Sequence, residues 1–175
     1  MKELLLIRHA KSSWKDESLP DIERPLNKRG FANAPMMGER LRESGVEIDR
    51  FYASPALRSR TTAEMIVEQL DDRRLTIEVI SSLYTFNYEE LLCWVRSLDD
   101  SLQRVAMVCH NPAVTDLTNF LALTHIGNIP TCGIVTLGMK VNSWRDAGAG
   151  MAVLEEYDYP KRDRDNLEPC LVSGE

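Results

Sequence analysis

Residues 4–11 read LLLIRHAK, an apolar run of four aliphatic residues that ends abruptly in two cations and an imidazole. A run this short suits a strand buried on both faces, as in a parallel sheet covered by helices. The carboxyl ends of such strands form the edge where open α/β folds place their ligands. Arg8 and His9 are therefore either residues of a functional site or ordinary surface charge at the end of a strand.

Short apolar runs alternate with amphipathic stretches along most of the chain. We expect strands at residues 4–7, 51–53, 76–80, 105–109, 133–141 and 151–157. With helices between them, this order predicts an α/β fold of three layers, αβα, with a mostly parallel central sheet. The last two strands are joined by a short loop, so this closing pair is open to an antiparallel arrangement.

Several helices of this pattern carry start or stop signals. Asn27 is an expected N-cap of a helix that reaches Ser44. Pro35 lies inside that helix and is expected to kink it or to split off its first turn. Pro55 and Pro112 are each expected to open the helix that follows them.

The chain length of 175 residues fits one domain with a core of its own. We expect this single domain to span residues 1–157. Residues 158–175 are charged, contain proline and are poor in apolar residues, so we expect a partly disordered tail there. Because the net charge is −6, a site for a negative ligand must be a local concentration of cations.

Composition argues against several classes of partner. No basic stripe is visible, so nucleic-acid binding is not expected. No apolar stretch approaches the roughly 20 residues that span a bilayer, and the first residues lack the features of a signal peptide, so no membrane partner is expected. The four cysteines show no paired spacing, which favours free thiols in a reducing compartment and a cytoplasmic location. The oligomeric state is open.

Polar residues follow three of the expected strands. The first strand ends in Arg8 and His9. The second is followed by Ser-Pro-Ala-Leu and then Arg58, and the strand of residues 105–109 is followed by His110. If these three strands are parallel, their carboxyl ends point the same way. Two arginines and two of the three histidines of the chain then surround one point.

Two guanidiniums and two imidazoles suit a dianionic phosphoryl group. Arginine carries permanent charge and grips phosphate oxygens with a planar fork of donors. A histidine among these groups can attack phosphorus through a ring nitrogen and form a phosphohistidine that water later cleaves. The other cations would stabilise the charge on the phosphoryl oxygens during transfer. This chemistry needs no metal and no cofactor, and we expect neither.

Five segments together resemble a known family. They are LLLIRHAKSSW at 4–14, RPLNKRG at 24–30, YASPALRSRTTAE at 52–64, VCHNP at 108–112 and IPTCGIVTL at 129–137. These segments look like the histidine phosphatase superfamily and are most similar to its branch of small phosphohistidine phosphatases, the SixA-like proteins. The resemblance covers nearly the whole chain up to about residue 157.

The resemblance implies a phosphatase that hydrolyses phosphohistidine through a covalent phosphohistidine intermediate. By position, His9 would be the nucleophile, Arg8 and Arg58 would bind phosphate, and His110 would be the second histidine, with all four counted as catalytic. We also expect Asn111, next to His110, among the phosphate-binding residues. The substrate would be a phosphorylated protein or a small phosphorylated molecule.

The sequence departs from the family pattern in two respects. Ala10 stands where the family's Arg-His-Gly motif has glycine, which is tolerated if the φ angle there is negative. The larger members also carry a glutamate general acid, and no clear equivalent stands out. Glu89 and Glu90 are more simply interpreted as first-turn residues of a helix. Without such an acid, a labile P–N bond is a better substrate than an alkyl ester.

Other functions are weighed against this hypothesis. A cysteine phosphatase needs an arginine six positions after its nucleophile, and no cysteine has one. Gly133 and Gly138 do not form a phosphate-binding loop, because the following lysine is out of register. Three scattered histidines do not supply a metal hydrolase. A small-metabolite phosphomonoesterase of the same superfamily and a non-catalytic phosphoryl-binding member remain as alternatives.

Two further observations are left open by the sequence. Lys11 is either an additional ligand for the anion or plain surface charge. Asp21 and Arg24 form either a pair that shapes the entrance to the site or an ordinary surface salt bridge.

Overall fold

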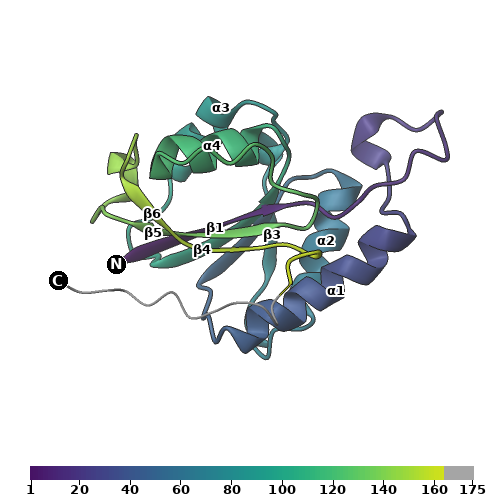
Figure 1. Ribbon diagram of the computed structural model, residues 1–175, viewed down its shortest axis with the longest axis horizontal. Helices are drawn as coiled ribbons and strands as arrows, with labels where there is room; N and C mark the ends of the chain where they lie inside the picture. The colour runs from purple at the N-terminus through teal and green to yellow at the C-terminus, as the bar shows by residue number, and fades with distance from the viewer. Residues whose placement is uncertain (164–175) are drawn as a thin grey trace.

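The computed structural model describes residues 1–163, which form one six-stranded sheet with helices on both faces (Figure 1). The strands are β1 (Lys2–Arg8), β2 (Arg50–Ala53), β3 (Ile77–Val79), β4 (Arg104–Cys109), β5 (Ile134–Met139) and β6 (Ala152–Asp158). The helices are α1 (Lys28–Glu43), α2 (Leu57–Val67), α3 (Tyr88–Val95) and α4 (Ala113–Ala122). Single turns of 3-10 helix lie at Asp21–Glu23, Ser81–Leu83 and Trp144–Asp146.

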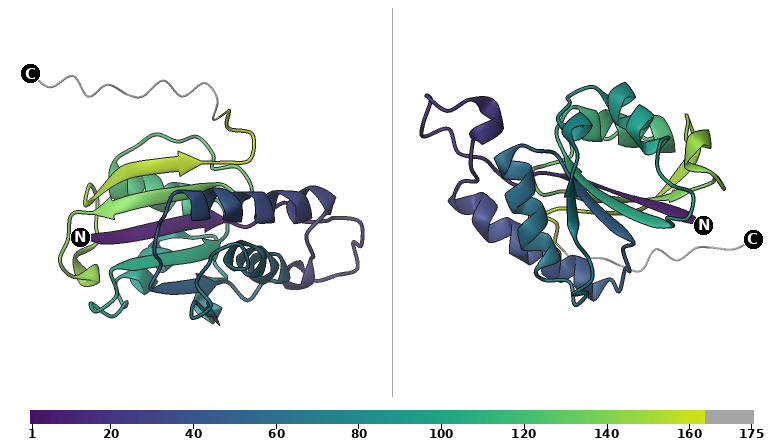
Figure 2. Two further views of the ribbon diagram at one scale, coloured as in Figure 1. Left: turned by 90° about the horizontal axis from the view of Figure 1, so that it is seen from below. Right: turned by 180° about the vertical axis from the view of Figure 1, so that it is seen from behind.

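The strand order in the sheet is β3-β2-β4-β1-β5-β6. The first four strands in chain order pair in parallel, whereas β5 is antiparallel to both β1 and β6. The predicted three-layer αβα fold with a mostly parallel sheet is therefore confirmed, and the closing pair is antiparallel. This arrangement places the carboxyl ends of β1, β2 and β4 side by side at one edge (Figure 2).

The apolar run of β1 is buried on both faces of the sheet. Leu4 and Leu6 belong to the core cluster beneath α3 and α4, whereas Leu5 and Ile7 belong to the cluster beneath α1 and α2. All four side chains are fully buried. Because successive side chains of a strand alternate between faces, an unbroken apolar run can only be accommodated by covering both faces with helices.

Helix boundaries differ from the expected ones by a few residues. The helix after β2 begins at Leu57 instead of Pro55, because Ser54–Ala56 form the turn that leaves the strand. Pro112 is the N-cap of α4 and not its first residue. Of the two effects expected of Pro35, a kink or a split-off first turn, the split does not occur, since the helix is continuous through Pro35. Buried residues on both sides of this proline hold α1 against the sheet.

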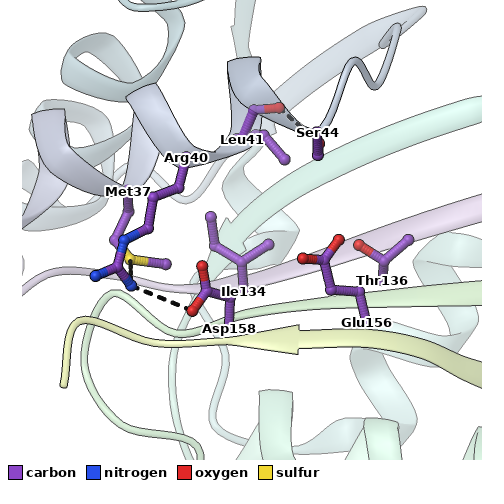
Figure 3. Close-up of a pocket in the computed structure, with 8 residues that line it drawn as sticks. All are labelled: Met37, Arg40, Leu41, Ser44, Ile134, Thr136, Glu156 and Asp158. Atoms are coloured by element: carbon purple, nitrogen blue, oxygen red, sulfur yellow. Dashed lines mark hydrogen bonds and ion pairs between the residues drawn. The ribbon is translucent and has the colours of Figure 1, made fainter. Parts of the chain in front are cut away.

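The last strand includes one residue that the sequence assigned to the tail. Asp158 ends β6, is buried, and forms an ion pair with Arg40 of α1 at 3.2 Å (Figure 3). The two side chains line a small cavity of about 10 Å³ between α1 and the β5–β6 edge, which has room for about one water molecule. Of the expected tail, residues 164–175 lie outside the described residues. No helix within residues 1–163 is long and apolar enough to cross a membrane.

Candidate active site

The ends of β1, β2 and β4 bring together the four residues that we call the histidine–arginine cluster: Arg8, His9, Arg58 and His110. The rings of His9 and His110 have centroids 5.2 Å apart. The Arg58 Nε donates to His9 Nε2 at 3.3 Å, and its Nη2 lies 3.4 Å from His110 Nδ1. Arg58 comes from the first turn of α2, so a helix start and two strand ends build the cluster.

The ring of His9 is held in one orientation by the backbone. Its Nδ1 lies 2.7 Å from the Ala10 carbonyl oxygen. A carbonyl oxygen can only accept, so Nδ1 carries the proton and donates it. The Nε2 atom of the neutral ring then carries the lone pair, and this is the atom that accepts the 3.3 Å contact from Arg58. His9 is thereby in the tautomer that a nucleophile at Nε2 requires.

The backbone around His9 is fixed by the neighbouring loop. The His9 N–H donates to the Cys109 carbonyl at 3.1 Å, and the Cys132 N–H lies 3.0 Å from the Arg8 carbonyl and 3.1 Å from that of His9. Cys132 itself has a φ of 61°, in the left-handed region that a non-glycine residue rarely adopts. Backbone strain of this kind costs about 1–3 kcal/mol and is typical of functional sites.

Alanine fits the position after His9 without strain. Ala10 is fully buried and its N–H donates to the Thr62 hydroxyl at 3.0 Å. Leu123 and Cys132 are the non-glycine residues with positive φ in the described part of the chain, so Ala10 has no need of glycine's conformational freedom.

Arg8 has one donor that the protein leaves unused. Its Nη1 donates to the Ile129 carbonyl at 2.7 Å and to Asn128 at 3.4 Å. Its Nε is, within residues 1–163, a buried polar atom with no hydrogen-bond partner. Buried N–H groups are almost always paired, and an unpaired one at a cluster of cations indicates that an anionic ligand completes the site.

Asn111 supports Arg8 through its side-chain hydrogen bonds to the 128–129 loop and to Thr115. Its Nδ2 donates to the same two acceptors that Arg8 uses, Asn128 at 3.0 Å and Ile129 at 3.1 Å. Its Oδ1 accepts from Thr115 at the start of α4. The side chain therefore positions the 128–129 loop behind Arg8, and its role as a phosphate ligand stays a prediction.

His110 lies deepest in the cluster. Its Nε2 is 2.7 Å from the Ser54 hydroxyl, a contact between the ends of β2 and β4. The rings of Tyr84 and Phe86 each have centroids 5.4 Å from that of His110. These two aromatic residues follow β3 in the chain and line one side of the cluster. No motif in the sequence identifies either of them as a site residue.

Burial keeps both histidines neutral. For His9, desolvation lowers the pKa to about 4, assisted by the positive charges of Arg58 and Arg8 and opposed by the hydrogen bond to Ala10. For His110, desolvation and the charges of His9 and Arg58 lower the pKa to about 3. A neutral imidazole keeps its lone pair available, so His9 is able to act as a nucleophile at neutral pH.

We expect a pH titration of the ligand-free protein, followed by NMR of the ring signals, to give midpoints below pH 5 for His9 and His110. Single His→Asn variants assign the signals. Added vanadate should raise both midpoints, because a nearby anion favours the imidazolium form. Midpoints at or above the ordinary 6.5 in the ligand-free protein would contradict this description of the cluster.

Asp21 is a member of the site whose importance sequence reasoning underestimated. The expected pair with Arg24 is present at 3.1 Å, but the same carboxylate also forms an ion pair with Arg58 at 2.9 Å. The Tyr84 hydroxyl donates to it at 2.5 Å. Asp21 lies in the loop between β1 and α1, which extends beyond the carboxyl end of β1 (Figure 1). This loop therefore folds onto the cluster through one carboxylate.

The remaining candidate residues lie outside these contacts. Lys11 is exposed, and only its backbone carbonyl is engaged, by Asn27. Glu89 and Glu90 occupy the first turn of α3 as expected, and Glu90 accepts a hydrogen bond from Thr85. Burial raises the pKa of the Cys132 thiol to about 12, which leaves no reactive thiolate there at neutral pH.

No group of three or more histidine, cysteine, aspartate or glutamate side chains within residues 1–163 is placed to hold a metal ion. The described part of the cluster supplies cationic and neutral donors for an anion and one imidazole lone pair for attack. This combination suits chemistry on a phosphoryl group.

Comparisons with known proteins identify the family. The histidine phosphatase superfamily (branch 1) matches residues 4–92, just over half of the chain. An uncharacterized chloroplastic protein of Arabidopsis thaliana is 29% identical over 157 residues, which cover 85% of this chain and 71% of that protein. A 2,3-bisphosphoglycerate-dependent phosphoglycerate mutase of Bartonella tribocorum is 34% identical over 96 residues, 51% of this chain and 45% of the mutase. The chain thus spans less than half the length of that mutase.

Solved structures share the fold. The protein histidine phosphatase SixA complexed with tungstate has a TM-score of 0.75 at 21% identity, with 90% of this chain and 97% of that chain covered. SixA from Agrobacterium tumefaciens has a TM-score of 0.78 at 24% identity, with 91% and 98% covered. The family match spans the segment that contains Arg8, His9 and Arg58, and it shows that this chain belongs to the histidine phosphatase superfamily.

Proposed function

We propose that this chain is a phosphatase that removes the phosphoryl group from phosphohistidine, with His9 as the nucleophile and a phosphohistidine at His9 as the intermediate. The observation that carries the proposal is the pairing of the His9 Nε2 lone pair, which meets only a long 3.3 Å contact from Arg58, with an unused, buried Arg8 Nε donor. The first would attack phosphorus, and the second would receive a phosphoryl oxygen.

The phosphoryl group would bind between the two arginines. The contacts from Arg58 to the two histidines, at 3.3 and 3.4 Å, are long for hydrogen bonds, and phosphoryl oxygens would take these donors. Arginine forks and phosphate oxygens match in geometry and charge. Tungstate, present in the SixA complex, is a tetrahedral oxyanion like phosphate, which supports a phosphoryl site in this fold.

The transfer has two steps. The Nε2 lone pair of His9 forms a bond to phosphorus while the bond to the substrate nitrogen breaks, and that electron pair goes to the leaving ring. Water then attacks phosphorus while the P–N bond to His9 breaks, the electron pair of that bond returns to Nε2, and phosphate leaves with both protons of the water. The proton stays on Nδ1, which donates to the Ala10 carbonyl throughout, and Arg8, Arg58 and His110 stabilise charge on the phosphoryl oxygens.

The substrate class follows from the acids that the described site contains. An alkoxide leaving group needs a proton in the transition state, and this help is worth about 10² to 10⁴ in rate. Asp21 is the carboxylate in contact with the cluster, and it is ionised at neutral pH. Glu90 is engaged by Thr85. Imidazole on a P–N bond departs without a protein acid, so phosphohistidine suits this site better than an alkyl ester.

A substrate panel tests the proposal. We expect kcat/KM for a phosphohistidine peptide to exceed that for phosphoserine and sugar phosphates by at least about tenfold, because ester hydrolysis needs a general acid that the described site lacks. All assays contain a chelator, because we also propose that the reaction needs no metal ion. Glu90→Gln should leave the hydrolysis of phosphohistidine nearly intact.

Three results would contradict parts of the proposal. Faster hydrolysis of esters than of phosphohistidine would make the protein a general phosphomonoesterase of the same superfamily. Phosphate binding without turnover or phosphoenzyme would make it a binding protein. Activity that the chelator abolishes and a divalent ion restores would contradict metal independence. We also propose a cytoplasmic location and a phosphorylated protein as the substrate. The single domain of the proposal includes Asp158.

A further inference from the structure

The carboxylate of Asp21 has no part in the phosphoryl transfer described above, yet it is held firmly at the cluster. Arg58 Nη2 donates to Oδ2 at 2.9 Å, the Tyr84 hydroxyl donates to the same oxygen at 2.5 Å, and Arg24 Nη1 donates to Oδ1 at 3.1 Å. The Asp21 side chain is 43% exposed, whereas that of Arg58 is 3% exposed. Asp21 is thus the solvent-side end of this ion pair.

The carboxylate can accept one more hydrogen bond. A carboxylate has about four acceptor positions, two on each oxygen. Tyr84 and Arg58 fill both positions on Oδ2, and Arg24 fills one on Oδ1. The second acceptor position on Oδ1 is not filled by any of the described residues. It belongs to a side chain that is exposed to solvent.

The chain of contacts places this open position on the leaving-group side of the reaction. Arg58 contacts His9 Nε2 through its Nε and contacts Asp21 through its Nη atoms, so one guanidinium separates the nucleophile from the carboxylate. Attack and departure occur roughly in line at phosphorus. With His9 at the end of the buried β1 strand, the leaving group departs toward solvent, where Asp21 lies.

We propose that Asp21 is the residue that selects the leaving group: it accepts a hydrogen bond from the ring N–H of a phosphohistidine side chain and disfavours leaving groups that depart with negative charge. This inference rests on the proposed phosphohistidine activity and gives it a structural basis. It assigns to Asp21 a contact with substrate, beyond the positioning of Arg58.

The chemistry of the two substrate classes explains the selection. A phosphohistidine ring that carries a proton on its other nitrogen departs as neutral imidazole when the P–N bond breaks, and an N–H···carboxylate bond stabilises that protonated ring. An ester releases an alkoxide or a phenolate, which a fixed carboxylate repels. Desolvation would raise the pKa of Asp21, but hydrogen bonds from Tyr84 and Arg58 lower it to about 2, so it has no proton to donate at neutral pH.

Asp21→Asn tests the inference, with Glu23→Gln as the matched control. Glu23 lies in the same 3-10 turn and is exposed, so its change removes one charge from the same segment. The Asp21 backbone carbonyl still accepts from Arg58 Nη1 at 2.6 Å in any side-chain variant, which keeps Arg58 anchored. Thermal unfolding compares the stability of the variants. Asp21→Ser, also neutral, should give the same result and covers a failure of the asparagine variant to fold.

We expect Asp21→Asn to lower kcat/KM for a phosphohistidine peptide by about 20-fold, the loss of one charge-assisted hydrogen bond. The value for p-nitrophenyl phosphate should stay within about threefold or rise, because the repulsion of its phenolate is removed. In the pH profile of kcat with the peptide, the alkaline limb should move down by about one pH unit, because the bound ring loses the group that favours its protonated form. Glu23→Gln should change none of these values.

Two outcomes would overturn the inference while leaving the proposed function intact. An equal fall for both substrates, with an unmoved pH profile, would mean that Asp21 only positions Arg58. An equal rise for both would mean that the carboxylate competes with the phosphoryl group for Arg58. Failure of the proposed function is seen separately, in the unmodified protein, as a preference for p-nitrophenyl phosphate over the phosphohistidine peptide, and the inference falls with it.

Discussion

Replacement of His9 by alanine is expected to lower kcat for a phosphohistidine peptide at least about a thousandfold, because the atom that would form the covalent intermediate is removed. The ring is held by the Ala10 carbonyl in the tautomer that leaves the lone pair on Nε2. His110 is buried deeper, with its Nε2 at the Ser54 hydroxyl. A rapid-quench assay should detect a phosphoenzyme in the unmodified protein and none in the variant.

His125→Ala is the matched control for this substitution. His125 is an exposed residue of the loop after α4, so its loss should leave the rate and the phosphoenzyme unchanged. Turnover by His9→Ala within tenfold of the unmodified protein would exclude His9 as the nucleophile. A phosphoenzyme of normal amount in the variant would point to His110 instead.

Arg58→Lys is expected to lower kcat/KM at least about a hundredfold for every phosphorylated substrate. The guanidinium contacts His9, His110 and Asp21 at the same time, through three different nitrogens. A lysine ammonium is a single point donor and cannot bridge these groups or grip two phosphoryl oxygens. The loss of one such preorganised donor typically costs 10²–10³ in kcat.

Arg60→Lys provides the comparison for Arg58→Lys. Arg60 lies in the same helix, is exposed, and donates to the Pro55 carbonyl, away from the cluster. Steady-state kinetics of the two variants, with vanadate binding as a second measure of the anion site, separate the two positions. Equal and small effects of both changes would show that Arg58 is a structural residue of α2.

Part of the site could be read directly from the sequence. The four-residue apolar run of β1 requires a sheet that is covered on both faces, and this requirement follows from residue type and the period of a strand alone. In such a sheet, residues that follow parallel strands must meet at one edge. Arg8, His9 and His110 were therefore identifiable, because each ends or directly follows a buried strand.

Arg58 was predictable for a related reason. It stands in the first turn of the helix that follows β2, so the short connection leaves it little freedom to lie elsewhere. The family resemblance confirmed by the comparisons added specificity to a pattern that local sequence had already suggested. Asn111 shows the limit of this reasoning, since adjacency to His110 does not decide whether a side chain faces the ligand or the 128–129 loop.

Other features of the site depended on contacts between residues far apart in the chain. The Ile129 carbonyl that holds Arg8, and the left-handed Cys132 that holds the His9 backbone, act through main-chain atoms that every residue type possesses. Such interactions leave no signature in residue type or spacing. They arise only when two segments are packed against each other.

Asp21 illustrates the same distinction within one side chain. Its spacing from Arg24 suggested an ion pair, and local sequence can suggest no more than that. The folding of the loop between β1 and α1 onto α2 brings the carboxylate to Arg58, and the turn after β3 brings Tyr84 to the same oxygen. The sequence by itself determined the sheet and the residues at its edge, because burial and periodicity are local properties. Only the tertiary structure decided which carboxylate meets them, because that depends on how three separate segments pack.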